Sequence, residues 1–96
     1  MLRHIVMLTF KPDATDDEKA TLCATVEAFG RDVEEVRALT CGFNVGSGPN
    51  HHDFAVVADF DDMDAFRRYI DSPAHKAYVA GPARIVAKLS AIQHPW

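Results

Sequence analysis

The chain has few cysteines, no cluster of basic residues and no long hydrophobic run, and each absence excludes a class of protein. Two cysteines in 96 residues, Cys23 and Cys41, are too few for a scaffold held by disulfides. Each falls in an apolar pattern, so we expect buried free thiols and a reducing, cytoplasmic location. No run approaches the roughly 20 apolar residues of a membrane span. Because Met1–Phe10 does not resemble a secretory signal, we also expect no export.

The ten basic residues are scattered along the chain, and the formal net charge is -4. Phosphate binding requires concentrated positive charge, so this pattern argues against nucleic acid and against an anionic membrane surface. Acidic residues gather at Asp13–Glu18 and Asp59–Asp64, where helices are expected to begin. Carboxylates at such positions stabilise the first helical turn, so we interpret them as helix caps and not as a recognition surface.

The length and composition predict one globular domain spanning residues 1–96. Hydrophobic residues make up 48% and charged residues 25% of the chain, an ordinary globular mixture. A domain of this size buries only about two-thirds of the surface of its unfolded chain. Association with a second copy would therefore add useful burial.

Leu2–Lys11 has the pattern of a strand with two apolar faces. Leu2, His4, Val6, Leu8 and Phe10 point to one side, while Ile5 and Met7 point to the other. A sheet with one face in water has polar residues on that face, so this strand is expected to be covered on both sides.

The rest of the chain predicts two helical regions and three further strands. Thr15–Glu18 has the pattern of a capping box. The helix after it carries an apolar stripe, and this helix is expected to fray near Gly30. A period of two then predicts a strand over Leu39–Val45, followed by a turn-rich loop at Gly46–Asp53. The remaining expected elements are a strand at Phe54–Phe60, a helix after Asp61 or Asp62 with Met63, Phe66, Tyr69 and Ile70 on one side, a short helix beginning at Pro73, a break at Gly81-Pro82, and a strand at Ala87–His94.

The resulting order, β-α-β-β-α-β, predicts an α+β fold of the ferredoxin-like kind. In this plan a four-stranded antiparallel sheet carries its helices on one face. The other face, with Ile5, Met7, Ala55 and Val57, stays apolar and needs a cover. We therefore expect a homodimer formed through the sheet face opposite the helices.

Several segments resemble the stress-responsive dimeric α/β-barrel (Dabb) family along nearly the whole chain. They are RHIVMLTFK at Arg3–Lys11, GFNVG at Gly42–Gly46, DFAVVADF at Asp53–Phe60 and, above all, YIDSPAH at Tyr69–His75. The resemblance implies a dimer in which two sheets face each other as one barrel. Most members of the family have no established biochemical role, some are plant stress proteins, and one type is a cofactor-free polyketide cyclase.

The resemblance also implies roles for three residues. In the cyclase type, the residue matching His75 is the general base, the residue matching Tyr69 hydrogen-bonds the substrate, and the residue matching His4 lines the same pocket. This chemistry is reasonable, since an imidazole can deprotonate a methylene between two carbonyls and a tyrosine can stabilise the resulting oxyanion. Neither a metal nor an organic cofactor is expected.

An apolar pocket between the sheet and the helices is expected around these three residues, with a small apolar or aromatic carbonyl compound as its ligand. Its predicted lining is Val6, Leu8, Leu22, Cys23, Val26, Phe54, Val56, Ile70 and Tyr78. Phe54 stands where the cyclase type has another histidine, so a different substrate, or no cyclase activity, is expected.

Two rival functions stay open on the sequence alone. One is a non-catalytic stress-responsive or ligand-binding protein in which His4, Tyr69 and His75 serve packing and local hydrogen bonding. The other is a cofactor-free monooxygenase, because a related barrel family of similar size oxidises phenols and quinols. A metal at His51-His52-Asp53 is not expected, since adjacent residues on a loop rarely present two imidazoles to one ion.

Overall fold

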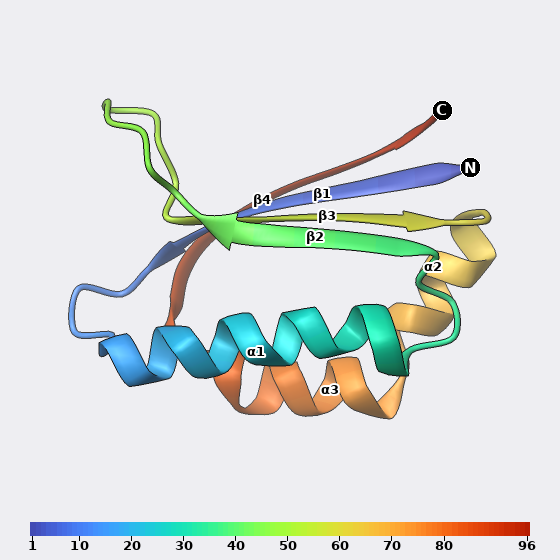
Figure 1. The fold of residues 1–96 in the computed structure, drawn as a ribbon, viewed down its shortest axis with the longest axis horizontal. Coiled ribbons are helices and arrows are strands. Elements are labelled where there is room, and N and C mark those ends of the chain that lie inside the picture. Colours follow the sequence, from blue (N-terminus) through green and yellow to red (C-terminus); the bar gives the residue numbers. More distant parts are fainter.

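Four strands, three helices and one 3₁₀ turn make up the computed structural model, which describes all residues 1–96 (Figure 1). In chain order they are β1 (Leu2–Phe10), α1 (Asp16–Asp32), β2 (Ala38–Phe43), β3 (Phe54–Phe60), α2 (Met63–Ile70), α3 (Pro73–Ala80), the 3₁₀ turn (Pro82–Ile85) and β4 (Val86–Pro95). The predicted β-α-β-β-α-β plan is confirmed, with its second helical region divided into α2 and α3.

The strands form one antiparallel sheet in the order β2-β3-β1-β4. All three helices lie on one side of this sheet in Figure 1, so the molecule has two layers and one uncovered sheet face. β1 and β3 are central, while β2 and β4 form the edges. This is the ferredoxin-like, α+β architecture that the sequence predicts.

The core lies between the sheet and the helices. Strand alternation buries Leu8 of β1 and both Phe54 and Phe60 of β3. Helix α1 contributes Leu22 from its apolar stripe. These four side chains are the largest that are fully sealed from solvent. The predicted division of β1 and β3 into a helix-facing and an opposite face therefore holds.

The helix starts follow from local hydrogen bonding. Thr15 and Glu18 form the expected capping box at α1, with both reciprocal bonds present. Asp62 accepts a hydrogen bond from the Ala65 amide at the start of α2, and Pro73 is the first residue of α3. All three starting positions agree with the sequence prediction.

Two predicted boundaries were wrong. α1 does not fray near Gly30 but continues to Asp32, where the amide of the buried Val33 donates to the Phe29 carbonyl and ends the helix. β2 ends at Phe43 and not at Val45, whose side chain is fully exposed, because its partner β3 begins only at Phe54. Alternation alone does not reveal where a partner strand stops.

The uncovered face combines an apolar centre with polar ends; we call it the open face. Ile92, Ile5 and Val57 lie side by side across three strands, and Met7 pairs with Ala55 in the next row. Met7 is 41% exposed and Ile92 57% exposed. At one end, Arg3 holds Asp59 through two hydrogen bonds of 2.9 and 3.1 Å, which lowers the carboxyl pKa below its usual range.

The loop between β2 and β3 rises from the sheet on the side away from the helices (Figure 1). Its His52 hydrogen-bonds Thr9 at 2.9 Å and Ser90 at 3.3 Å, both on the open face. Asp53 accepts a hydrogen bond from the Phe10 amide at 2.8 Å. The polar residues of this loop thus anchor it to β1 and β4.

None of the helices has the length and apolarity needed to cross a membrane.

Candidate functional site

A cavity of about 260 Å³ opens between the sheet and the helices. Eleven of the fourteen residues around it are hydrophobic, and they come from all the helices and from three strands. The lining consists of His4, Val6 and Leu8 of β1, Val26 and Phe29 of α1, Val56 of β3, Phe66, Tyr69 and Ile70 of α2, His75 and Tyr78 of α3, and Leu89, Ala91 and Gln93 of β4.

The cavity exists because the helices do not extend over the edge strand β4. Leu89 points to the helix side, since it pairs with the buried Leu8, yet it is 61% exposed. β1 is covered by helices, whereas its neighbour β4 is not, so an apolar hollow remains at this edge. An apolar hollow with a few polar groups is the usual form of a small-molecule site.

His4 is a buried polar residue in the wall of the cavity. It is 8% exposed, and its ring lies 4.7 Å from the Phe66 ring, centroid to centroid. The Gln93 side-chain amide donates to His4 Nδ1 at 2.9 Å, which leaves the proton of the neutral imidazole on Nε2. Burial, and then the charge of His75, lowers the pKa of His4 to about 4.

His75 reaches the cavity from the first turn of α3. Its backbone amide donates to the Ser72 hydroxyl at 3.2 Å, and that hydroxyl donates to the Tyr69 carbonyl at 2.7 Å. The ring is half-buried and packs 4.8 Å from the Tyr69 ring and 5.9 Å from the Phe29 ring. Burial lowers the pKa of His75, so the imidazole is a neutral base at physiological pH.

Tyr69 and Tyr78 add two hydroxyl groups to the same space. Burial raises the pKa of each above its ordinary value, and the nearby Tyr78 raises the pKa of Tyr69 further. Both hydroxyls therefore remain protonated at neutral pH. Every side-chain polar atom that is sealed from solvent has a hydrogen-bond partner in the chain. Neither tyrosine hydroxyl has a partner in the chain, so both oxygens remain accessible to solvent or to a ligand.

Nine of the twelve residues predicted for the site surround this one cavity. They are His4, Tyr69, His75, Val6, Leu8, Val26, Val56, Ile70 and Tyr78. Leu22, Cys23 and Phe54 do not. Leu22 is sealed in the core, Phe54 packs against Phe10 and Phe43, and Cys23 lies beside Cys41.

The cysteines also differ from the prediction of buried thiols. Both are free but only half-buried, because they lie where α1 packs against the edge strand β2.

Five lining residues were missed, namely Phe29, Phe66, Leu89, Ala91 and Gln93. Phe29 and Phe66 belong to helix stripes that the sequence already revealed, and only their direction toward the cavity was unknown. The β4 residues depend on the sheet order, because β4 meets His4 only as the neighbour of β1. Gln93 is the important omission, since it sets the tautomer of His4.

A second, larger groove of about 650 Å³ lies at the start of α1. Only two of its ten lining residues are hydrophobic, and the groove is open to solvent along charged side chains such as Asp17 and Arg84. It brings together neither a histidine nor a tyrosine. The smaller apolar cavity is therefore the better candidate, because it contains the groups that can bind and transfer protons.

The fold and its apolar cavity define a class of ferredoxin-like domain, and the comparison with known families makes the assignment specific. Residues 2–93 match the family described as Dabb, the Stress responsive A/B Barrel Domain. The chain belongs to this family. It is also 40% identical over 83 residues to an uncharacterised protein of Streptomyces coelicolor, an alignment that covers 83% of this chain and 84% of the relative.

Solved structures agree with the family assignment. A dimeric ferredoxin-like protein of unknown function from Thermobifida fusca is 30% identical, with a TM-score of 0.87, over 99% of this chain and 90% of that one. A hydroxynitrile lyase from Passiflora edulis shares the fold at 15% identity, with a TM-score of 0.86, over 97% of this chain and 90% of that one. A dimeric protein of the same fold from Bacteroides fragilis is 21% identical, with a TM-score of 0.83, over 99% of this chain and 95% of that one.

Proposed function

We propose that this chain binds a small apolar or aromatic carbonyl compound in the cavity and acts on it as a cofactor-free enzyme with His75 as general base. One observation carries the proposal. Apart from His4 Nδ1, which accepts from Gln93, the polar groups of His4, Tyr69, His75 and Tyr78 have no hydrogen-bond partner in the chain and line a mainly apolar hollow. Such groups recognise the polar atoms of a ligand whose body is apolar.

The protonation states support a division of roles. His75 is neutral, so it can accept a proton from the carbon next to a carbonyl group. The electron pair of the broken C–H bond moves to the carbonyl oxygen, which becomes an enolate. Tyr69 can donate its hydroxyl hydrogen bond to that oxygen. His4 supplies a second neutral donor at Nε2, because Gln93 occupies Nδ1.

An enolate formed in this way would attack a second carbonyl carbon, as in an aldol condensation of a polyketide-like chain. The new carbon–carbon bond leaves an alkoxide, and protonated His75 can return its proton there, so the base is regenerated. A cavity of about 260 Å³ accommodates a compact, single-ring product. The hydroxynitrile lyase of Passiflora edulis is an enzyme on the same fold, and at 15% identity that likeness concerns the fold alone.

The test begins with a thermal-shift screen of aromatic and polyketide-like carbonyl compounds, followed by a turnover assay on the compounds that bind. His75→Gln should lower kcat by about 100-fold or more, the usual contribution of a general base. Tyr69→Phe should lower kcat and leave the melting temperature nearly unchanged, because the hydroxyl has no partner to lose. Val79→Ala is a matched control, since Val79 is exposed on α3 and lies outside the cavity lining.

Binding without turnover in the wild type, together with a large stability loss in His75→Gln, would contradict catalysis and favour a non-catalytic binding protein. Oxygen uptake with a phenolic substrate, measured by an electrode, would replace the proposed chemistry with that of a monooxygenase.

We also propose that the open face is covered by a second copy of the chain. The apolar row of Ile92, Ile5 and Val57 supports this arrangement, as do the structures from Thermobifida fusca and Bacteroides fragilis, which are described as dimeric. The free thiols Cys23 and Cys41 support a reducing location such as the cytoplasm.

A further inference from the structure

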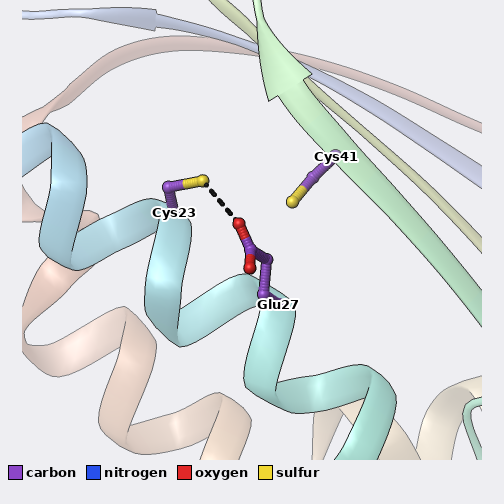
Figure 2. Close-up of side chains that lie close together, drawn as sticks. All are labelled: Cys23, Glu27 and Cys41. Carbon is purple, nitrogen blue, oxygen red and sulfur yellow. Dashed lines mark hydrogen bonds between the residues drawn. The ribbon is translucent and has the colours of Figure 1, made fainter.

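Two thiols and a carboxylate meet at the contact between α1 and β2, on the helix side of the sheet and outside the cavity. Cys23 and Glu27 are four residues apart and share one face of α1, while Cys41 faces them from β2 (Figure 2). The Cys23 thiol donates to Glu27 Oε1 at 3.2 Å. Both sulfur atoms and one carboxylate oxygen lie within 4.8 Å of one another.

We propose that Cys23, Glu27 and Cys41 form a binding site for a soft divalent metal ion of the Zn²⁺ type. Two thiolates and one carboxylate are a ligand set that Zn²⁺ accepts, and three protein ligands leave a fourth position for water. The site is half-buried, with Glu27 exposed, so an ion and its water molecule can enter from solvent.

The geometry needs only a small contraction to hold the ion. With metal–sulfur bonds of about 2.3 Å, two sulfur ligands in a tetrahedron lie about 3.8 Å apart. The donor atoms are already within 4.8 Å, so rotations about side-chain torsions bring them to bonding distance. The backbones of α1 and β2 can stay where they are.

The charge balance favours a divalent cation. In the absence of metal, Cys23 and Cys41 are free thiols. Binding then releases two protons, one from each thiol. The product contains two thiolates, one carboxylate and one M²⁺, with a net charge of -1. An ion bound here would connect α1 to the edge strand β2, so its binding should stabilise this edge of the sheet.

Co²⁺ is a suitable probe, because thiolate coordination gives it intense charge-transfer absorption and a tetrahedral site gives it strong visible bands. The full chain, reduced and stripped of metal, should bind one Co²⁺ per chain, and Zn²⁺ should displace it. Cys41→Ser should weaken binding by more than about 100-fold, since loss of a second-sphere partner alone costs 10- to 100-fold. Glu27→Gln should weaken binding less and retain the charge-transfer band. The wild-type melting temperature should rise with Zn²⁺.

Asp32→Asn is the matched control, since it removes an exposed carboxylate from the same helix and should leave binding unchanged. His51→Gln, which alters the histidine pair on the loop, should also have no effect. Absence of the thiolate bands in the reduced wild type would overturn the proposal. So would Co²⁺ binding that survives Cys41→Ser, or a reduced protein that gains no stability from Zn²⁺ while readily forming a Cys23–Cys41 disulfide in air. None of these readouts depends on catalytic activity.

Discussion

At the scale of single residues, the two cavity histidines differ because their surroundings differ. His4 is 8% exposed, surrounded by aromatic rings and fixed by Gln93 through Nδ1. His75 is half-buried, and both of its ring nitrogens are free to meet a ligand. The first histidine is therefore a fixed hydrogen-bond donor and the second an accessible base, although a sequence displays the two as the same residue type.

The burial of His4 gives a pH dependence of stability. The folded-state pKa is about 4, below the ordinary value of 6.5, so the unfolded chain takes up the proton first as pH falls. Folding stability should therefore decrease between pH 6.5 and 4, by an amount on the order of 3 kcal/mol at most. The free energy of unfolding, measured by urea denaturation at several pH values in this range, should fall more steeply with decreasing pH for the wild type than for His4→Gln. Parallel curves for the two proteins would show that His4 does not titrate in this way.

At the scale of secondary-structure elements, alternation and capping were sufficient to predict where most elements begin. The Thr15 capping box, the Asp62 cap and Pro73 all mark helix starts as expected. The ends were predicted less well, because they depend on tertiary neighbours: α1 runs past Gly30 as far as Asp32, where the buried Val33 caps it. The signals for helix starts depend on a few adjacent residues, whereas the ends of elements also depend on tertiary packing.

Ser72 connects the two helices that bring Tyr69 and His75 together. Its hydroxyl accepts from the His75 amide and donates to the Tyr69 carbonyl, so it caps α3 and fixes the α2–α3 corner. Ser72→Ala should cost about 1 kcal/mol of stability, as the loss of a helix cap usually does. The substitution should also weaken ligand binding and turnover, because the position of α3 determines where the His75 side chain lies in the cavity. Thermal denaturation and the binding assay measure the two effects separately.

Thr15→Ala is the matched control for Ser72→Ala. Thr15 caps α1 at the far end from His75, so its loss should cost similar stability and leave binding unchanged. Equal losses of ligand binding and turnover in both variants would indicate that general destabilisation, and not a change in the position of α3, explains the result.

At the scale of the whole molecule, the predicted cavity residues fall into two groups. Nine of them, from β1, α1, β3 and the second helical region, do meet in one hollow, since the fold plan places them on the same side of the sheet. Leu22, Cys23 and Phe54 lie on that side as well, but nearer to β2 or deeper in the core. The order β2-β3-β1-β4 decides which edge is left uncovered by helices. This order comes from long-range pairing, so residues such as Gln93 could not be placed from the sequence.

The proposed dimer through the open face can be tested with charged substitutions. A charge at its centre, in Met7→Glu or Val57→Asp, would be buried without a partner between two apolar sheets, which is costly. The wild type should scatter light as a particle of two chains, and each variant as a single chain with a lower melting temperature. Val79→Glu is the matched control, because Val79 is an exposed hydrophobic residue on the helical layer. A wild-type monomer, or a dimer unaffected by either charge, would show that two sheets do not meet through this face.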